Sequence, residues 1–153
     1  MTVKEIYLDH SATTPVCDEA IQAMHEVMAV RYGNPSSLHR KGLEAERLLK
    51  GASQTFLSAI RAPQDRGEIL YTSGGTEANN LAISGTAALL RQNRRHIITS
   101  AMEHSSVLET VLEWGKNGFE VTLLKPDSSG VITVEKVLEA VRPETGLISL
   151  MHV

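Results

Sequence analysis

The chain has 153 residues, a length at which one domain buries a substantial core, and its composition of 42% hydrophobic and 22% charged residues is typical of globular proteins. A net charge of −3 argues against a nucleic-acid partner, and no apolar run approaches the length of a membrane span, so we expect neither membrane insertion nor secretion. The single cysteine, Cys17, excludes an internal disulfide and favours a cytoplasmic location.

The predicted elements alternate between helices and strands over most of the chain. A helix begins near Asp18 and ends before the turn residues at 33–37. The later predicted elements are a helix from about 39 to 61, a buried strand at 68–72, a helix to about 91, a strand at 96–100, a helix at 105–116, a strand at 119–124, a helix at 133–141 and a strand at 147–153. This order indicates an α/β fold with a largely parallel sheet flanked by helices and right-handed crossovers. Because the last strand ends the chain, we expect the fold to continue in residues beyond Val153.

A glycine turn between the strand at 68–72 and the following helix predicts a phosphate site. Gly74 and Gly75 allow close approach of a bound group, and Ser73 and Thr76 add hydroxyl donors. The first helical turn presents unpaired N–H groups and the positive end of the helix dipole. Neither a Walker motif nor a dinucleotide fingerprint fits, because there is no Lys-Ser/Thr pair and no third glycine. A plain helix cap with Thr76 as the capping residue is the structural alternative.

A second motif follows the strand at 96–100, where His104 stands at the predicted start of a helix. In a parallel sheet this turn lies on the same rim as the glycine turn. The helix dipole disfavours a charged imidazole there, so a neutral ring that stacks on an aromatic cofactor and moves protons is expected. The alternative role of His104 is to cap the helix.

Several segments together resemble the cysteine desulfurases of the NifS/IscS-like group, which are pyridoxal-phosphate enzymes of the class V aminotransferase type. The matching segments are Tyr7–Pro15, Gly33–Ser37 with His39, Tyr71–Glu77, His96–Ser100, Glu103–His104 and Met151–Val153. They cover the whole chain in the order of the family. No metal site is predicted.

The resemblance implies the N-terminal part of the large domain of a fold type I pyridoxal 5′-phosphate enzyme. It implies that Gly75 and Thr76 hold the phosphate, with Ser73 at the edge of the site, and that His104 stacks on the pyridine ring and assists proton transfer. Residues 1–15 would form a segment near the active site or small domain, with Asp9–Thr14 on the substrate side, and 16–153 would belong to the large domain. Two further residues, Asn34 and His39, would lie near the active site or dimer interface, or act as turn former and helix-start residue.

The implied activity converts L-cysteine to L-alanine and passes the sulfur to an enzyme cysteine as a persulfide, for iron–sulfur cluster assembly or thiolation. The Schiff-base lysine and the sulfur-accepting cysteine are not placed in this chain, and Cys17 is not expected to accept sulfur. We therefore expect a C-terminal half as partner, a homodimer of complete protomers and a sulfur-acceptor protein. The alternatives are a selenocysteine lyase, another class V aminotransferase, a truncated non-catalytic partner-binding module and a simple phosphate-binding α/β domain.

Overall fold

The computed structural model describes residues 6–63 and 67–152, and the chain divides into two compact units at Leu70 and Tyr71. Each unit is described by itself. Among the described residues, no helix combines the length and the apolar character needed to cross a membrane.

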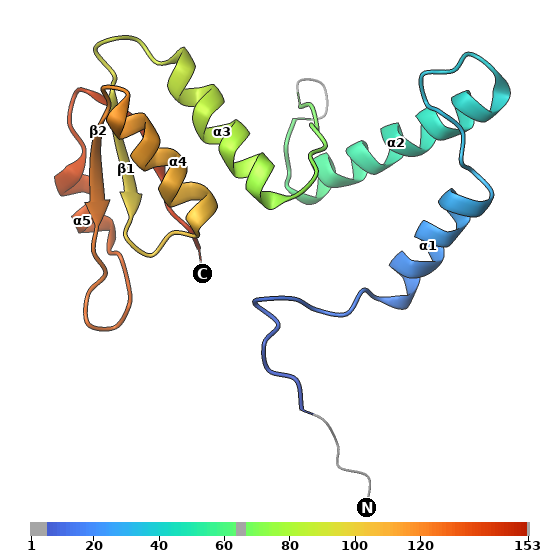
Figure 1. The fold of residues 1–153 in the computed structure, drawn as a ribbon, viewed down its shortest axis with the longest axis horizontal. Helices are drawn as coiled ribbons and strands as arrows, with labels where there is room; N and C mark the ends of the chain where they lie inside the picture. The colour runs from blue at the N-terminus through green and yellow to red at the C-terminus, as the bar shows by residue number, and fades with distance from the viewer. Residues whose placement is uncertain (1–5, 64–66, 153) are drawn as a thin grey trace, which may run out of the picture. The chain divides into compact units, whose positions relative to one another are not determined.

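The first unit contains two helices, α1 (Asp18–Ala29) and α2 (Arg40–Ala59), as Figure 1 shows. Helix α2 begins where the sequence predicts, because the His39 Nδ1 atom accepts a hydrogen bond of 3.3 Å from the Gly42 N–H and caps the helix. The turn between the helices is wound tightly: a Cβ atom at Gly33 or Gly42 would overlap a backbone carbonyl of the same turn. Glycine is therefore required at both positions for packing.

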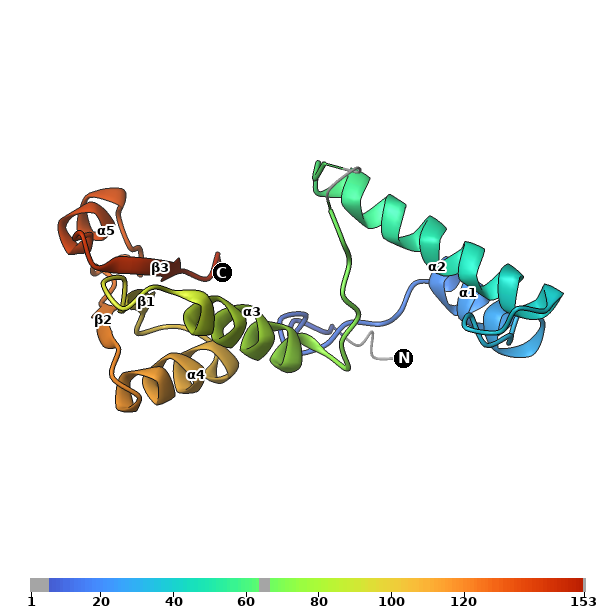
Figure 2. The ribbon, with the colours of Figure 1, turned by 90° about the horizontal axis from the view of Figure 1, so that it is seen from above.

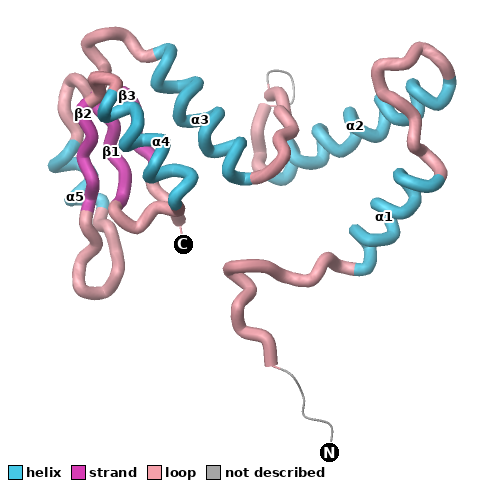
Figure 3. The backbone as a smooth tube through the Cα atoms, viewed as in Figure 1, coloured by secondary structure: helices cyan, strands magenta, loops and turns pink. Residues whose placement is uncertain are grey.

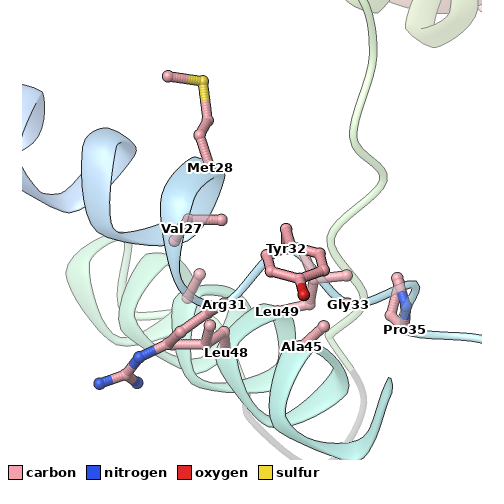
Figure 4. Close-up of a pocket in the computed structure, with 10 residues that line it drawn as sticks. Val27, Met28, Arg31, Tyr32, Gly33, Pro35, Ala45, Leu48 and Leu49 are labelled. Atoms are coloured by element: carbon pink, nitrogen blue, oxygen red, sulfur yellow. The ribbon is translucent and has the colours of Figure 1, made fainter. Parts of the chain in front are cut away.

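A hydrophobic cavity of about 510 Å³ lies between α1 and α2. Figure 4 shows Val27 and Met28 of α1 on one side and Leu48 and Leu49 of α2 on the other. None of the residues of α1 is buried, so this unit has little core of its own. The cavity carries no cluster of ionisable groups of the kind that catalysis needs: of its lining residues only Arg31 and Tyr32 ionise.

The second unit is a three-layer α/β arrangement. Its elements are α3 (Gly75–Leu89), β1 (His96–Ser100), α4 (Ser105–Lys116), β2 (Glu120–Leu124), α5 (Val134–Ala140) and β3 (Thr145–Ser149). The sheet has the order β2-β1-β3 and both pairings are parallel, with Ile98 opposite Thr122 and Ile148. Helices α3 and α4 cover one face of the sheet and α5 lies on the other (Figures 1 and 2). The predicted α/β fold with a parallel sheet is confirmed.

The core of the second unit lies between the central strand and the α3/α4 layer. All five residues of β1 are buried. The residues that make up this core are Ile83, Ala87, Ile97, Val107, Val111 and Phe119. The Trp114 ring packs edge-on against Phe119, with 5.1 Å between centroids, and its Nε1–H donates to the Ser84 hydroxyl of α3 at 3.1 Å. This contact joins the two helices at the end of the unit away from their first turns.

The strand predicted at 68–72 is not formed, and its predicted burial is also wrong. These residues lie outside helices and strands (Figure 3). Leu70 and Tyr71 are 69% and 51% exposed. The physical reason is that a strand requires a hydrogen-bonded neighbour, and the sheet of the described residues consists of β1, β2 and β3 alone. The apolar composition of this segment indicates a tendency to be buried, but it does not supply the neighbouring strand.

Candidate functional site

The glycine turn leads directly into α3, which begins at Gly75 with Gly74 as its N-cap. In the described part of the chain, no hydrogen-bond acceptor occupies the N–H groups of Gly75 or Thr76, whereas the Ala78 N–H is already bonded to the Gly74 carbonyl at 3.1 Å. Unpaired N–H groups at a helix start carry a partial positive charge and attract anions. The turn thus offers a small anion-binding surface on its first two helical residues.

Ser73 has a different local role from these two residues. Its backbone N–H and its hydroxyl both donate to one carboxylate oxygen of Glu77, each at 2.7 Å. These bonds, the backbone one first, lower the pKa of Glu77 and keep its carboxylate ionised. The Ser73 donors are therefore taken up by the chain itself, whereas the N–H groups of Gly75 and Thr76 have no acceptor among the described residues.

The two glycines of the turn are not explained by the packing of the chain. A Cβ atom at Gly74 or Gly75 would find no atom within 4 Å, and neither residue lies in the left-handed region that favours glycine, since Gly74 is extended with a φ of 169°. Glycine at these positions leaves free space directly over the unpaired N–H groups. That space is what a phosphate group needs for direct hydrogen bonds to the backbone.

His104 stands at the start of α4 as its N-cap residue. The Ser106 N–H donates to its Nδ1 atom at 3.1 Å, and the Ser106 hydroxyl oxygen lies 2.8 Å from the same atom. The His104 side chain is exposed while Ser106 is buried, and Nε2 makes no hydrogen bond to a described residue. The capping role and an accessible Nε2 therefore coexist in one ring.

Hydrogen bonds between α3 and α4 bring the glycine turn and His104 to the same end of the unit. Asn79 Nδ2 of α3 donates to the Ser106 hydroxyl at 2.9 Å. One turn away, the Thr110 hydroxyl donates to Asn80 Oδ1 at 2.6 Å, and Asn80 Nδ2 donates to the Thr76 carbonyl at 2.8 Å. Both helices begin toward the end of the sheet where β1 finishes, and the first turn of α3 extends beyond the start of α4 (Figure 1), because Ser106 contacts Asn79 and not the first residues of α3.

Glu103 is a buried carboxylate at this rim, with 8% of its surface exposed. Its Oε1 atom accepts hydrogen bonds from the Ser100 hydroxyl and from the Met151 N–H, both at 2.8 Å. The first bond ties it to the end of β1 and the second to the segment after β3. Glu103 thereby holds the ends of two neighbouring strands together beside His104.

Thr99 of β1 carries the one buried side-chain oxygen without a partner in the described residues. Because side chains alternate along a strand, Thr99 lies on the same sheet face as Ile97, the face that α3 and α4 cover. A buried, unpaired hydroxyl is costly, and a functional role is one of the physical explanations for it. Thr99 is the last residue but one of β1, and the candidate site lies at this end of the strand.

The other predicted site residues belong to the first unit. The Asp9–Thr14 segment folds around the Tyr7 hydroxyl, whose oxygen lies 2.9 and 3.0 Å from the carbonyl oxygens of Asp9 and Thr13, so that one proton serves both. Asn34 forms a turn in which its Oδ1 accepts from the Ser36 N–H at 2.9 Å, and His39 caps α2. In this unit both residues therefore perform the structural roles of turn former and helix cap.

Four residues of the site were not identified from the sequence: Glu77, Asn79, Glu103 and Ser106. Glu77 stands at the third helical position of α3, where an acidic residue is typical of a capping box, so this residue could have been found. Asn79 and Ser106 are 27 residues apart and no local pattern connects them. Glu103 directly precedes the predicted site residue His104, but its hydrogen bond to the Met151 N–H depends on the pairing of β1 with β3.

Comparison with known proteins places this geometry in a family. The model of the "Aminotransferase class-V" family matches residues 6–153. The chain belongs to the class V aminotransferase family. It is similar to "Cysteine desulfurase IscS" of Dictyoglomus turgidum, with 44% identity over 149 residues that cover 97% of this chain and 37% of the relative.

Among solved structures of this family, a "NifS-like protein" has a TM-score of 0.84 at 33% identity and covers 91% of this chain and 38% of its own. A structure described as "SspA in complex with cysteine" has a TM-score of 0.86 at 37% identity, over 96% of this chain and 42% of its own. The chain thus spans 37% of the length of the desulfurase that it matches. The predicted resemblance to the NifS/IscS-like group is confirmed.

Proposed function

We propose that this chain is the N-terminal portion of a pyridoxal 5′-phosphate-dependent cysteine desulfurase and that it holds the phosphate end and the ring face of the cofactor. The observation that carries the proposal is that α3 and α4 both start toward the same end of the sheet. One start has unpaired N–H groups at Gly75 and Thr76 under open glycine space, and the other presents the exposed His104 ring. The N–H groups of Gly75 and Thr76 would bind the anionic end of a flat ligand, and the His104 ring would bind its face.

The residues of the chain fit the cofactor in two separate ways. The Gly75 and Thr76 N–H groups and the Thr76 hydroxyl would hold the phosphate, with Ser73 and Glu77 shaping the turn behind them. The His104 ring would stack on the pyridine ring, and its Nε2 could hold or move a proton there. When bound, pyridoxal phosphate supplies an electron sink for bond cleavage in an amino-acid substrate.

We infer L-cysteine as the substrate of the complete enzyme, which would be converted to L-alanine as its sulfur joins an enzyme cysteine thiolate to give a persulfide. The name of the D. turgidum relative and the cysteine in the SspA structure support this choice. The covalent lysine and the sulfur-accepting cysteine would come from a C-terminal portion. Cytoplasmic location, a homodimer, and service to iron–sulfur cluster assembly or thiolation through a sulfur-acceptor protein are parts of the same proposal.

The cofactor site is tested by the binding of pyridoxine 5′-phosphate to the 153-residue chain, because this probe has no aldehyde that could react with surface lysines. Gly75→Asp should weaken binding about tenfold or more, since a carboxylate at a helix start is compatible with folding but repels phosphate and fills the open space. Gly85→Asp is the matched control: Gly85 is exposed on the same helix, a Cβ there meets no atom within 4 Å, and binding should not change. Equal binding of pyridoxine and its phosphate would contradict the proposal.

The substrate is tested with the chain reconstituted with a C-terminal portion. The complex should show the absorbance of bound pyridoxal and should release alanine from L-cysteine. Cys17→Ser should leave the rate unchanged, because Cys17 lies at the start of α1 and is not in the predicted sulfur-accepting segment. Strong preference for selenocysteine would instead identify a selenocysteine lyase, and a complex without a pyridoxal chromophore would favour the non-catalytic module.

A further inference from the structure

A chain of hydrogen bonds leads from α3 through Ser106 to the ring of His104. Asn79 Nδ2 donates to Ser106 Oγ at 2.9 Å, and Ser106 Oγ lies 2.8 Å from His104 Nδ1. Since the Asn79 amide uses a lone pair of the hydroxyl oxygen, the hydroxyl proton is free to point at Nδ1. The Ser106 N–H donates to the same Nδ1 atom at 3.1 Å. The ring nitrogen is thus faced by two donors.

A nitrogen that accepts hydrogen bonds from two donors carries no proton of its own. The proton of the neutral imidazole must therefore reside on Nε2, the atom that makes no hydrogen bond to a described residue on an exposed side chain. We propose that Asn79 and Ser106 are positioning residues that set the orientation and the tautomer of His104, so that Nε2–H is the group presented to a ligand. The significance of this tautomer for catalysis rests on the proposed function, but the tautomer itself does not.

The environment of Ser106 supports a specific role beyond packing. The Ser106 side chain is buried, with 7% of the residue exposed, and its hydroxyl stands between a donor on one side and an acceptor on the other. Its carbonyl oxygen lies 2.9 Å from the Thr110 hydroxyl oxygen, so the first turn of α4 packs closely around it. Ser105, the adjacent residue, is exposed and lies outside this network.

The test is a long-range ¹H–¹⁵N correlation spectrum of the imidazole nitrogens in the ¹⁵N-labelled 153-residue chain, with the His104 signals assigned by their loss in His104→Gln. In the unsubstituted chain at neutral or higher pH, Nδ1 should resonate as an unprotonated nitrogen and Nε2 as a protonated one. A protonated Nδ1 would overturn the proposal without any variant. The buried His96 gives separate signals that report whether each variant is folded.

Two substitutions should change the His104 signals in different ways. Ser106→Ala removes one donor, so the two ¹⁵N shifts should move toward each other as both tautomers become populated, and Ser106→Thr should restore them. Asn79→Asp replaces a donor by an acceptor and draws the hydroxyl proton away from His104, so it should raise the Nδ1-protonated population more than Ser106→Ala does, although the Ser106 N–H still faces Nδ1. Unchanged His104 shifts in both variants, with His96 signals intact, would refute the positioning role; where one variant is unfolded, the other decides.

Matched controls separate hydrogen bonding from general effects. Ser105→Ala removes a neighbouring hydroxyl, and Ala78→Asp adds the same charge as Asn79→Asp at an adjacent exposed position of α3. Both should leave the His104 tautomer unchanged. Pyridoxine 5′-phosphate binding is measured on the same samples, so that loss of the cofactor site and loss of the tautomer are read independently.

Discussion

At the scale of single residues, His96 connects all three strands of the sheet. It lies on β1 and is 1% exposed. Its Nδ1 is 2.8 Å from the Thr145 hydroxyl of β3, and its Nε2 is 2.9 Å from the Thr122 hydroxyl of β2. Since Thr145 Oγ1 also accepts from the Arg142 N–H at 2.9 Å, its hydroxyl proton is available to His96, and the neutral ring satisfies both threonines.

This environment makes the stability of the second unit dependent on pH. Burial, and then the positive charge of Arg142, lower the pKa of His96 below its ordinary value of about 6.5. Because protonation is harder in the folded than in the unfolded state, the stabilisation is complete above about pH 6.5 and declines as the pH falls through that value toward the lowered one. Urea unfolding followed by Trp114 fluorescence should show this decline between about pH 7.5 and pH 5.

Two substitutions test whether the pH dependence of stability comes from the His96 side chain. His96→Asn should be less stable at neutral pH, since it loses hydrogen bonds to buried hydroxyls, but its stability should vary less with pH. His25→Asn, at an exposed position of α1, should keep the full pH dependence. An unchanged pH dependence in His96→Asn would show that another group is responsible.

The hydrogen-bond partners of His104 and His96 could not be predicted from the sequence. His104 was predicted as a residue of functional importance from its place after a strand and before a helix. The bonds that orient it could not be predicted, because Asn79 and Ser106 come together only through the packing of α3 on α4. His96 was predicted only as part of a strand, since nothing in the local sequence shows that threonines of two other strands lie beside it.

At the scale of elements, helix α3 separates a buried stripe from an exposed one. Ile83 is 5% exposed in the core, whereas Leu89 on the same helix is 87% exposed. Ile83→Ala should lower the free energy of unfolding by about 2–5 kcal/mol, because it leaves a cavity against Ile97 and Val111. Leu89→Ala should change it by less than about 0.5 kcal/mol. Urea titration with Trp114 fluorescence measures both, and equal losses would contradict the described packing of α3.

Most helices and the strands that have partners were predicted closely, whereas the segment at 68–72, which has no partner strand in the described sheet, was not. The helix α4 and the strand β1 match their predicted ranges, and Thr133 caps α5 as expected, with its hydroxyl accepting from the Lys136 N–H at 3.4 Å. The segment at 68–72 has an equally apolar pattern but no neighbouring strand in the described sheet. Helix periodicity and caps are properties of one segment, whereas strand formation is a property of two.

At the scale of the whole molecule, the two units differ in how much of their structure is buried. No residue of α1 is buried, while Ile97 and Ile98 of β1 have no exposed surface. In hydrogen–deuterium exchange followed by mass spectrometry, peptides of α1 should exchange orders of magnitude faster than peptides of β1, although both are hydrogen-bonded elements. Similar protection of both would mean that the apolar face of α1 is covered in solution.

Five glycines of the chain differ in what an added Cβ atom would meet, and therefore in how substitutions there should behave. At Gly33, Gly42 and Gly146, an added Cβ would overlap backbone atoms, whereas at Gly74 and Gly75 it would meet nothing within 4 Å. In a library of all single substitutions, changes at the first three positions should be lost under selection for protein abundance. Changes at Gly74 and Gly75 should survive that selection and disappear only when growth depends on the enzyme. A genetic screen could thus separate the glycines that the packing of the chain requires from those that the proposed phosphate site requires.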